Sequence, residues 1–418
     1  MDRRNSERSC ASEVSPSTGA LPLPPRRAAK RAAEDPEKPE KASKQIKKKQ
    51  ELSIKPDLRS LPIGGVMLTF GQGDFGQLGL GEEITEKTRP AAIPTYQDII
   101  AITAGGMHNV CLRKTGEVLT FGCNDDGALG RNTSKEGSET VPLPVELPGK
   151  VIQVTAGDSH TAALLEDGRV FAWGTFRILP NEKIVKVASG NDHLVLLSEN
   201  GRVYTCGCGE QGQLGRVAAR TATRNTRQGK GPLLTPGVVE FKISKKLKFD
   251  NIWAGNFCTF AREHKKGDIY VFGLNNFNQI GLKDREIHFH PQVSKTFSGK
   301  EWKHISSGEH HTVALDSEGQ VFVMGRKEYG RLGLGANCSD AEELTLVPAI
   351  SSIKYIDVDT GSRESFAVTE TGDGEDVEEP ALVKGKQLDG KTVVRISGGG
   401  QHTLALATMR LVKDKTAG

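Results

Sequence analysis

Aromatic side chains are scarce in this chain, at 6% of its 418 residues, and no apolar run is long enough to cross a membrane. The seven cysteines contain no CxxC pair, and the nearest two are Cys206 and Cys208. An odd, unpatterned set of cysteines predicts reduced thiols and argues against a disulfide framework or a zinc site. The opening residues MDRRNSERSC lack the apolar core of a secretory signal. We therefore expect a soluble intracellular protein that binds no membrane, metal or cofactor.

Positive charge is concentrated at one end of the chain. Residues 1–50 hold 13 Lys or Arg against 7 Asp or Glu, whereas the whole chain has a net charge of +4. Residues 1–60 are rich in Pro, Ser, Ala, Lys and Glu, which predicts a disordered basic tail. This tail contains two basic clusters, Arg26, Arg27, Lys30 and Arg31, then Lys44, Lys47, Lys48 and Lys49. Such clusters indicate either a solvated tail or a nuclear localisation signal that also contacts DNA phosphates.

Two short signatures repeat along the rest of the chain. The first ends a strand-like run on glycine, and these glycines are Gly71, Gly122, Gly174, Gly207, Gly273 and Gly325. The second is AGGMHNVCL at Ala104, and it returns at Ala156, Ser189, Ser307 and Gly398, with weaker copies at Ala254 and Thr360. Each unit contains about four strand-like runs separated by glycine turns. Repeats of this length predict an all-β, seven-bladed β-propeller, which we place at residues 61–413, with a C-terminal tail at 414–418.

Two of the seven units are shorter than the others. The third runs from AWG directly to TFRILPNEK, and only 33 residues separate Gly174 from Gly207. The seventh has no opening strand and passes from ETGDGEDVEEP to its last two strands. We therefore expect both the third and the seventh blades to be truncated.

Comparing the units with one another separates structural from functional candidates. One position holds His108, His160, His193, His311 and His402, so we expect these five side chains to make the same structural hydrogen bond. The preceding position varies, and it holds Met107, Ser159, Asp192, Phe257, His310, Arg363 and Gln401. Because the fold does not dictate this residue, its polar members are the better candidates for binding a partner.

The two signatures together, with longer strings such as FGCNDDGALGRNTS and CGCGEQGQLGR, resemble the regulator of chromosome condensation family. The resemblance covers nearly all of residues 66–413. It implies a seven-bladed propeller that sits on chromatin in the nucleus and exchanges guanine nucleotide on the small GTPase Ran. An exchange factor makes and breaks no covalent bond, so it is not an enzyme in the strict sense.

The resemblance also implies roles for particular residues. Asp192 and His310 match the residues most tied to nucleotide exchange. Further contacts to the GTPase are expected from Asp74, His108, Asp158, Arg216 and His402. Chromatin contacts, to the acidic patch of the nucleosome histones and to DNA, are expected from Arg224, Arg227 and Lys230 in the long fourth unit and from the lysines of the tail. The tail would also bind nuclear import receptors.

Other functions remain open. The third unit lacks the family's protruding wedge, the hairpin that presses toward the nucleotide site of the GTPase. A chromatin-binding scaffold that has lost exchange activity is therefore the main alternative. A photoreceptor that uses this repeat needs a tryptophan cluster, but the chain has only Trp173, Trp253 and Trp302. A hydrolase is disfavoured, because GxSxG is absent from the repeats.

Overall fold

The computed structural model describes residues 53–55, 58–60, 63–174, 182–222, 231–241, 247–369 and 381–410. These residues form antiparallel β-strands joined by turns, with one short helix, α1 (Gly231–Leu234), and a few single 3-10 turns. Within the described ranges, no helix has the length and apolar character needed to cross a membrane. The all-β class predicted from the repeats is confirmed.

The sheets follow the sequence order, because each turn leads one strand back beside the strand before it. One four-stranded sheet contains β3 (Ile99–Ala104), β4 (His108–Arg113), β5 (Val118–Gly122) and β6 (Leu143–Val145), and another contains β10 (Ile184–Ser189), β11 (His193–Ser198), β12 (Val203–Gly207) and β13 (Gly237–Val238). A further four-stranded sheet contains β14 (Phe249–Ala254), β15 (Cys258–Glu263), β16 (Ile269–Gly273) and β17 (His288–Val293). The next contains β18 (Trp302–Ser307), β19 (His311–Asp316), β20 (Val321–Gly325) and β21 (Ala341–Leu346).

Two sheets are smaller, as the short units predict. In the described part of the chain, one has three strands, β7 (Val151–Ala156), β8 (His160–Leu165) and β9 (Val170–Gly174). The other has two, β22 (Tyr355–Thr360) and β23 (Ser365–Thr369).

The remaining sheet joins strands from both ends of the described chain. Its order is β2 (Glu86–Ile93), β1 (Val66–Gln72), β25 (His402–Met409) and β24 (Lys391–Gly398). β1 pairs with β25 in a continuous register, from Val66 opposite Ala407 to Gly71 opposite His402. This pairing closes the ring by hydrogen bonds, and it leaves no open edge between the first and last units.

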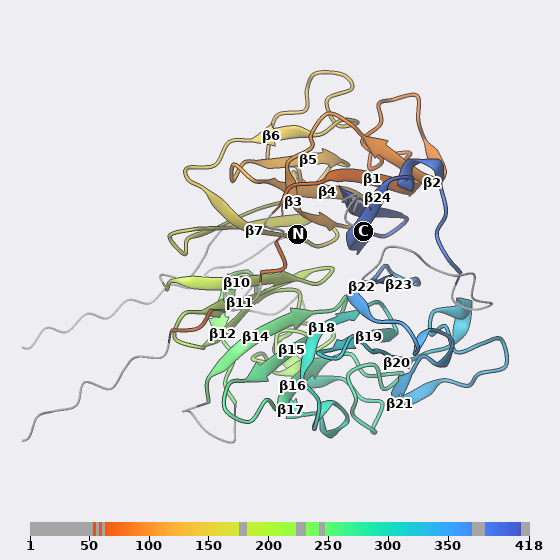
Figure 1. Ribbon diagram of the computed structural model, residues 1–418. Helices are drawn as coiled ribbons and strands as arrows, with labels where there is room; N and C mark the ends of the chain where they lie inside the picture. The colour runs from red at the N-terminus through yellow and green to blue at the C-terminus, as the bar shows by residue number, and fades with distance from the viewer. Residues whose placement is uncertain are drawn as a thin grey trace, which may run out of the picture. The chain divides into compact units, whose positions relative to one another are not determined.

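The first strand of each sheet contacts the first strand of the next sheet around the ring. These contacts run from β24 to β3, β7, β10, β14, β18 and β22, and from β22 back to β24 (Figure 1). The propeller is therefore confirmed. Within the described residues, six sheets have three or four strands and form blades, whereas β22 and β23 form a hairpin. Seven complete blades are not confirmed.

Every inner strand is bulged near its start. The register shifts at the same place in all seven sheets, for example between Val151 and Gln153 and between Ile184 and Lys186. A bulge turns the following side chain to a new direction. Here it directs polar residues toward the central channel, where Gln153 hydrogen-bonds the backbone of Val187 and Lys186 Nζ donates to Asn251 Oδ1 at 2.6 Å. The bulges therefore give neighbouring blades polar contacts at the channel.

The glycine that ends the third strand of a blade, such as Gly122 at the end of β5, is required for steric reasons. Gly122 has φ +106°, and a Cβ there would lie 2.5 Å from the carbonyl oxygen of Met107. Only glycine adopts this conformation at so close an approach of two backbones.

The segment before the first strand contacts the propeller, although it lies within the predicted tail. Ile54 is 4% exposed and packs in a core with Val195 and Phe249, and its N–H donates to the Glu199 carbonyl at 3.2 Å. Arg59 hydrogen-bonds His304 and Asp357 on the inner strands β18 and β22. Residues 1–52 lie outside the described residues, as do residues 411–418.

Candidate functional site

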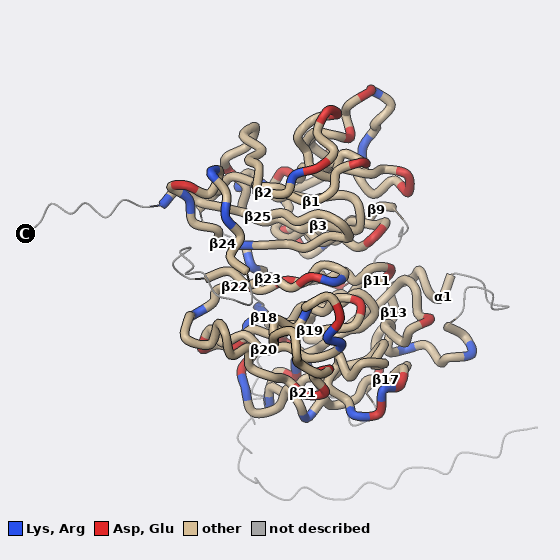
Figure 2. Tube along the Cα trace, turned by 90° about the vertical axis from the view of Figure 1, so that its right-hand side faces the viewer, with Lys and Arg blue, Asp and Glu red and all other residues tan. Residues whose placement is uncertain are grey.

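The seven loops between the inner and second strands form one rim of the ring. They span residues 105–107, 157–159, 190–192, 255–257, 308–310, 361–364 and 399–401. The turn after the third strand is tied to the same rim, because the N–H groups of Cys123, Cys208 and Arg326 donate to rim carbonyls at 2.7–2.9 Å. Figure 2 shows Lys, Arg, Asp and Glu distributed around the molecule, many of them in loops on its outer side.

The repeated histidines fasten each blade to the next. The Nε2 atoms pair with a polar side chain of the neighbouring sheet at 2.8–3.0 Å in five pairs: His108 with Thr161, His160 with Ser189, His193 with Thr259, His311 with Ser365, and His402 with Asn109. At one of the junctions without histidine, Cys258 Sγ contacts Ser307 Oγ at 3.4 Å. The structural hydrogen bond predicted from the repeats is confirmed.

The hydrogen bonds and the burial of these imidazoles together indicate their protonation state. Thr161 Oγ1 donates to the carbonyl of Ala128, so it accepts the Nε2–H proton of His108. Burial lowers the pKa of His108 to about 4 and that of His193 to about 3, because charging an imidazole away from water is unfavourable. These histidines are therefore neutral in the folded protein at physiological pH.

We call this set of inter-blade hydrogen bonds the frame. Two histidines that were expected to contact the GTPase belong to it. His108 and His402 are 1% and 3% exposed, and each imidazole is engaged by the neighbouring blade. We assign both imidazoles to the frame, and their contact with the GTPase stays a prediction from the family resemblance.

The acidic candidates do gather at the rim. Asp158 is exposed and Asp192 is half-buried, and they lie on adjacent loops joined by the Asp158 N–H to Asn191 carbonyl bond of 2.8 Å. The pKa of Asp158 is raised to about 6, mainly by desolvation and in addition by the negative charges of Asp192 and Glu309. The three carboxylates therefore share one region of negative potential, which suits a cationic group on a partner.

His310 has a different environment. Its Nδ1 lies 3.8 Å from Glu309 Oε2, and its ring meets the edge of Phe277 with centroids 5.1 Å apart. Burial lowers its pKa and Glu309 opposes that shift, while the charges of Arg331 and Arg326 lower it further. His310 is therefore a neutral, half-exposed hydrogen-bonding group between an acidic and a basic part of the rim.

Aromatic residues beside this group were missed by the sequence analysis. Arg326 stacks on Phe277 at 4.9 Å, and the adjacent turn exposes 74% of Tyr329, which has φ +65°. Phe75 is 48% exposed in the matching turn of the first unit. The sequence does contain a pattern that could have identified them: Phe75, Phe277 and Tyr329 occupy one repeat position, just before the turn that resembles Gly-Gln-Leu-Gly. Exposed aromatic and arginine side chains are typical anchors of protein interfaces.

Arg216 and Asp74 have contrasting positions. The Arg216 guanidinium donates to the carbonyls of Thr205, Pro232 and Thr235 at 2.9–3.0 Å. These bonds hold the chain around α1, and the expected contact of Arg216 with the GTPase stays a prediction. Asp74 is exposed in the turn after β1 and remains a candidate.

The basic candidates cannot be placed. Arg224, Arg227 and Lys230, the lysines Lys44, Lys47, Lys48 and Lys49, and the cluster Arg26, Arg27, Lys30 and Arg31 lie outside the described residues. Across the described ranges, no group of three or more His, Cys, Asp or Glu side chains is arranged to hold a metal ion.

Comparison with known proteins defines the class. A family model described as the RCC1-like domain matches residues 66–405. The chain is 44% identical over 405 residues to the regulator of chromosome condensation of Xenopus laevis, covering 87% of this chain and 95% of that protein. It is also 44% identical over 395 residues to the human protein of the same name, covering 84% and 91%.

Solved structures agree with this class. Prp20p of Saccharomyces cerevisiae, described with its binding properties to Gsp1p and histones, has a TM-score of 0.75 at 25% identity and covers 85% of this chain and 94% of its own. Yeast RCC1 (Prp20) in complex with Kap60 has a TM-score of 0.76 at 25% identity, covering 92% and 97%. The fold is that of an RCC1-like propeller. The chain belongs to the regulator of chromosome condensation family.

Proposed function

We propose that this protein is a guanine nucleotide exchange factor for the small GTPase Ran and that it works on chromatin in the nucleus. The observation that carries the proposal is the shared negative potential of Asp158, Asp192 and Glu309 on the rim of a propeller of this family. The relation to yeast Prp20p, described with its binding to Gsp1p and histones, supports both halves of the proposal.

Exchange requires no covalent chemistry from the protein. It requires a higher affinity for the nucleotide-free GTPase than for the nucleotide-bound form, because only a difference in affinity shifts the population. The carboxylates would engage basic groups of the GTPase near its nucleotide. His310 would add a neutral hydrogen bond, and Phe277 with Tyr329 would supply apolar contact area.

Chromatin binding is assigned to other parts of the chain. We propose that Arg224, Arg227 and Lys230 pair with the acidic patch of the nucleosome and that the basic tail contacts DNA and import receptors. The complex of yeast RCC1 with Kap60 supports an import receptor as a partner of the family.

The test measures release of labelled GDP from Ran. We expect Asp192→Ala to lower the exchange rate about tenfold or more, a loss of about 1.4 kcal/mol or more of stabilisation, while the thermal midpoint changes little. Glu318→Ala is the matched control, because Glu318 is exposed in the turn between β19 and β20, at the opposite end of β19 from the rim loop. Equal rates for wild type and Asp192→Ala would refute the assignment of Asp192.

One observation favours a second function. In the described residues, the sheet of β7–β9 ends at Gly174 with three strands, at the position where the family's wedge is expected. A propeller without the wedge would remain a chromatin-binding scaffold. Wild-type protein that binds nucleosomes but does not accelerate GDP release at saturating concentration would favour this alternative.

A further inference from the structure

His310 differs from the repeated histidines in how its imidazole is held. A frame histidine bonds a neighbouring blade through Nε2, as His311 does with Ser365 Oγ at 3.0 Å. Within the described part of the chain, no hydrogen bond reaches the His310 imidazole, and its Nδ1 lies 3.8 Å from Glu309 Oε2, beyond hydrogen-bond distance. The orientation of this imidazole therefore depends on its ring contacts.

The ring that contacts His310 belongs to the preceding blade. Phe277 lies in the turn after β16, and its ring stands at 87° to the imidazole, with the two centroids 5.1 Å apart. The guanidinium of Arg326, from the turn after β20, lies over the same phenyl ring at 4.9 Å. Edge-to-face and cation–π contacts each favour one relative arrangement of the groups that make them. The phenyl ring thus links the imidazole of one rim loop to a turn of the same blade.

The turn that carries Phe277 is held by hydrogen bonds of its own. The Phe277 N–H donates to Gln279 Oε1 at 2.9 Å, and Gln279 Nε2 donates to Asn276 Oδ1 at 3.0 Å. Asn278 is 2% exposed and has φ +62°, and its Nδ2 donates to the Leu282 carbonyl at 2.8 Å. A side chain supported in this way orients a functional neighbour more precisely than one on a mobile loop.

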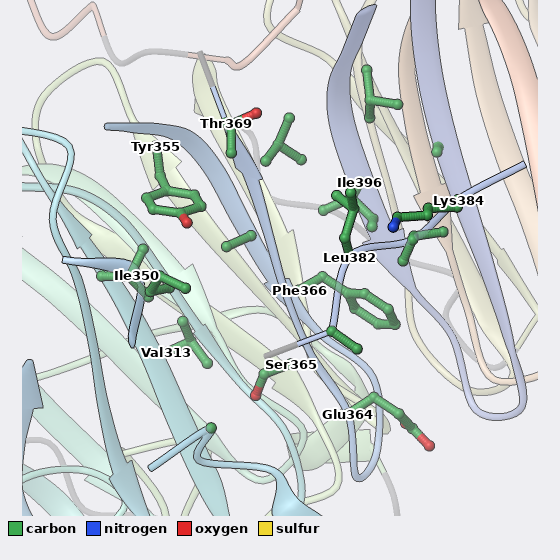
Figure 3. A pocket seen from close by; sticks show the side chains of 18 of the residues that line it. Val313, Ile350, Tyr355, Glu364, Ser365, Phe366, Thr369, Leu382, Lys384 and Ile396 are labelled. Atoms are coloured by element: carbon green, nitrogen blue, oxygen red, sulfur yellow. The ribbon is translucent and has the colours of Figure 1, made fainter. Parts of the chain in front are cut away.

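A second aromatic residue of this kind faces a different part of the surface. Tyr329 occupies the repeat position of Phe277 one unit later, and the Arg363 guanidinium lies 5.2 Å from its ring. Both residues border the groove beside β23, in which Figure 3 shows Tyr355 on one side and Leu382 on the other. Of these two pairs, that of Phe277 is the one that contains a candidate exchange residue.

We propose that Phe277 is a positioning residue for nucleotide exchange, and that it holds the His310 imidazole in one orientation for contact with the GTPase. This inference rests on the function proposed above for the rim. The phenyl ring does more than add apolar contact area, because it restricts the rotation of an imidazole that it contacts edge to face. A partner then meets a group that is already oriented, so less conformational entropy is lost when the complex forms.

The first test compares rates of GDP release from Ran. Phe277→Leu keeps an apolar side chain but removes the ring, so we expect the rate to fall about fivefold, whereas Phe277→Tyr keeps the ring and should stay within about twofold of wild type. In a His310→Ala background, Phe277→Leu should change the rate by less than about twofold, because no imidazole remains to be held. Equal losses in the two backgrounds would overturn the proposal, since Phe277 would then act through its own contact with the GTPase.

The second test needs no GTPase. In protein labelled with ¹³C-histidine, with the His310 signal assigned by its loss in His310→Ala, relaxation measures the order parameter of the imidazole. We expect a lower order parameter in Phe277→Leu than in wild type, and recovery of the wild-type value in Phe277→Tyr. An unchanged order parameter in Phe277→Leu would overturn the proposal.

Phe322→Leu is the matched control for both tests. The Phe322 ring also makes an edge-to-face contact, with Trp302 at 5.6 Å, and a cation–π contact, with Lys300 at 4.6 Å. It lies near the start of β20, whereas the rim turn follows the end of that strand. We therefore expect Phe322→Leu to leave the His310 order parameter and GDP release unchanged, and a drop in either one equal to that of Phe277→Leu would overturn the proposal.

The two tests also separate this proposal from the proposed function. Wild-type protein that does not accelerate GDP release would refute the exchange function and, with it, the role of Phe277 in exchange. Wild-type protein that accelerates release, with a rate that His310→Ala lowers and Phe277→Leu does not, would refute the positioning role alone.

Discussion

Asp192 and His193 are neighbours in the sequence, yet the fold gives them opposite roles. His193 is fully buried and bonds the next blade, while the Asp192 side chain remains half-exposed among other carboxylates. Their separation arises because the strand begins at His193 and the loop ends at Asp192. A single step along the chain thus divides the frame from the candidate partner surface.

The buried histidines predict a loss of stability in acid. Their pKa values in the folded protein are lowered, to about 3 for His193, His311 and His402, so the unfolded chain binds more protons below pH 6.5. Stability is therefore full above about pH 6.5 and falls as the pH decreases. At pH 5.5 each such histidine lowers the free energy of unfolding by about 1.4 kcal/mol relative to its value at pH 7.5.

Urea unfolding at these two pH values measures this dependence. The variant His193→Gln should be less stable than wild type at pH 7.5 by about 1–3 kcal/mol, and its stability should depend less on pH. His264→Gln is the control, because His264 is half-exposed and belongs to no inter-blade pair. A pH slope that is unchanged in His193→Gln would contradict the explanation.

At the scale of the strand, the turn glycines carry a second prediction. Gly122→Ala should destabilise the protein by about 2–4 kcal/mol, because its Cβ would collide with the Met107 carbonyl in addition to the strain of φ +106°. Gly127 has φ +76° but open space around its Cβ, so Gly127→Ala should cost about 1–2 kcal/mol. Equal losses in thermal unfolding would show that the contact with Met107 has no effect.

The two-stranded sheet should be the least protected element of the ring. Among the described residues, β23 has one paired neighbour and mostly half-buried side chains, whereas β19 has two and is buried throughout. Local opening is easier where fewer contacts are lost. Native-state hydrogen exchange should therefore be faster in residues 365–369 than in residues 311–316. The reverse order would indicate that the hairpin is stabilised by contacts other than strand pairing.

The sequence predicted the strands and turns better than the contacts between distant segments. The repeat of histidines predicted a structural bond, because a side chain required in every unit belongs to the frame. The use of Arg216 could not be predicted, since it depends on the path of residues 231–235 around its guanidinium. Neither could the contacts of Ile54 and Arg59, because their segment has the composition of a disordered tail and its anchors are far along the chain.

At the scale of the whole propeller, Arg59 ties the pre-strand segment to the two-stranded sheet. Arg59 bonds Asp357, which is 2% exposed, and Asp357 also accepts the N–H of Ile396 from β24. Removing the guanidinium leaves a buried carboxylate with less compensation. Arg59→Ala should lower the free energy of unfolding by about 2–4 kcal/mol, while Lys55→Ala, at an exposed site, should change it by less than about 0.5 kcal/mol. Chemical denaturation compares the two, and equal stabilities would show that Arg59 is dispensable.

The pairing of β1 with β25 brings residues 66 and 407 opposite each other. A short linker between the ends of the propeller would therefore span little distance, and new ends could be opened in the exposed turn at residues 132–137 without cutting a strand. A circularly permuted protein of this kind would close its ring through a different sheet. In the permuted protein, synthesis would begin at a different sheet while the ring stays the same. Comparing its folding with that of the original protein would therefore separate the effect of strand order from the effect of ring geometry.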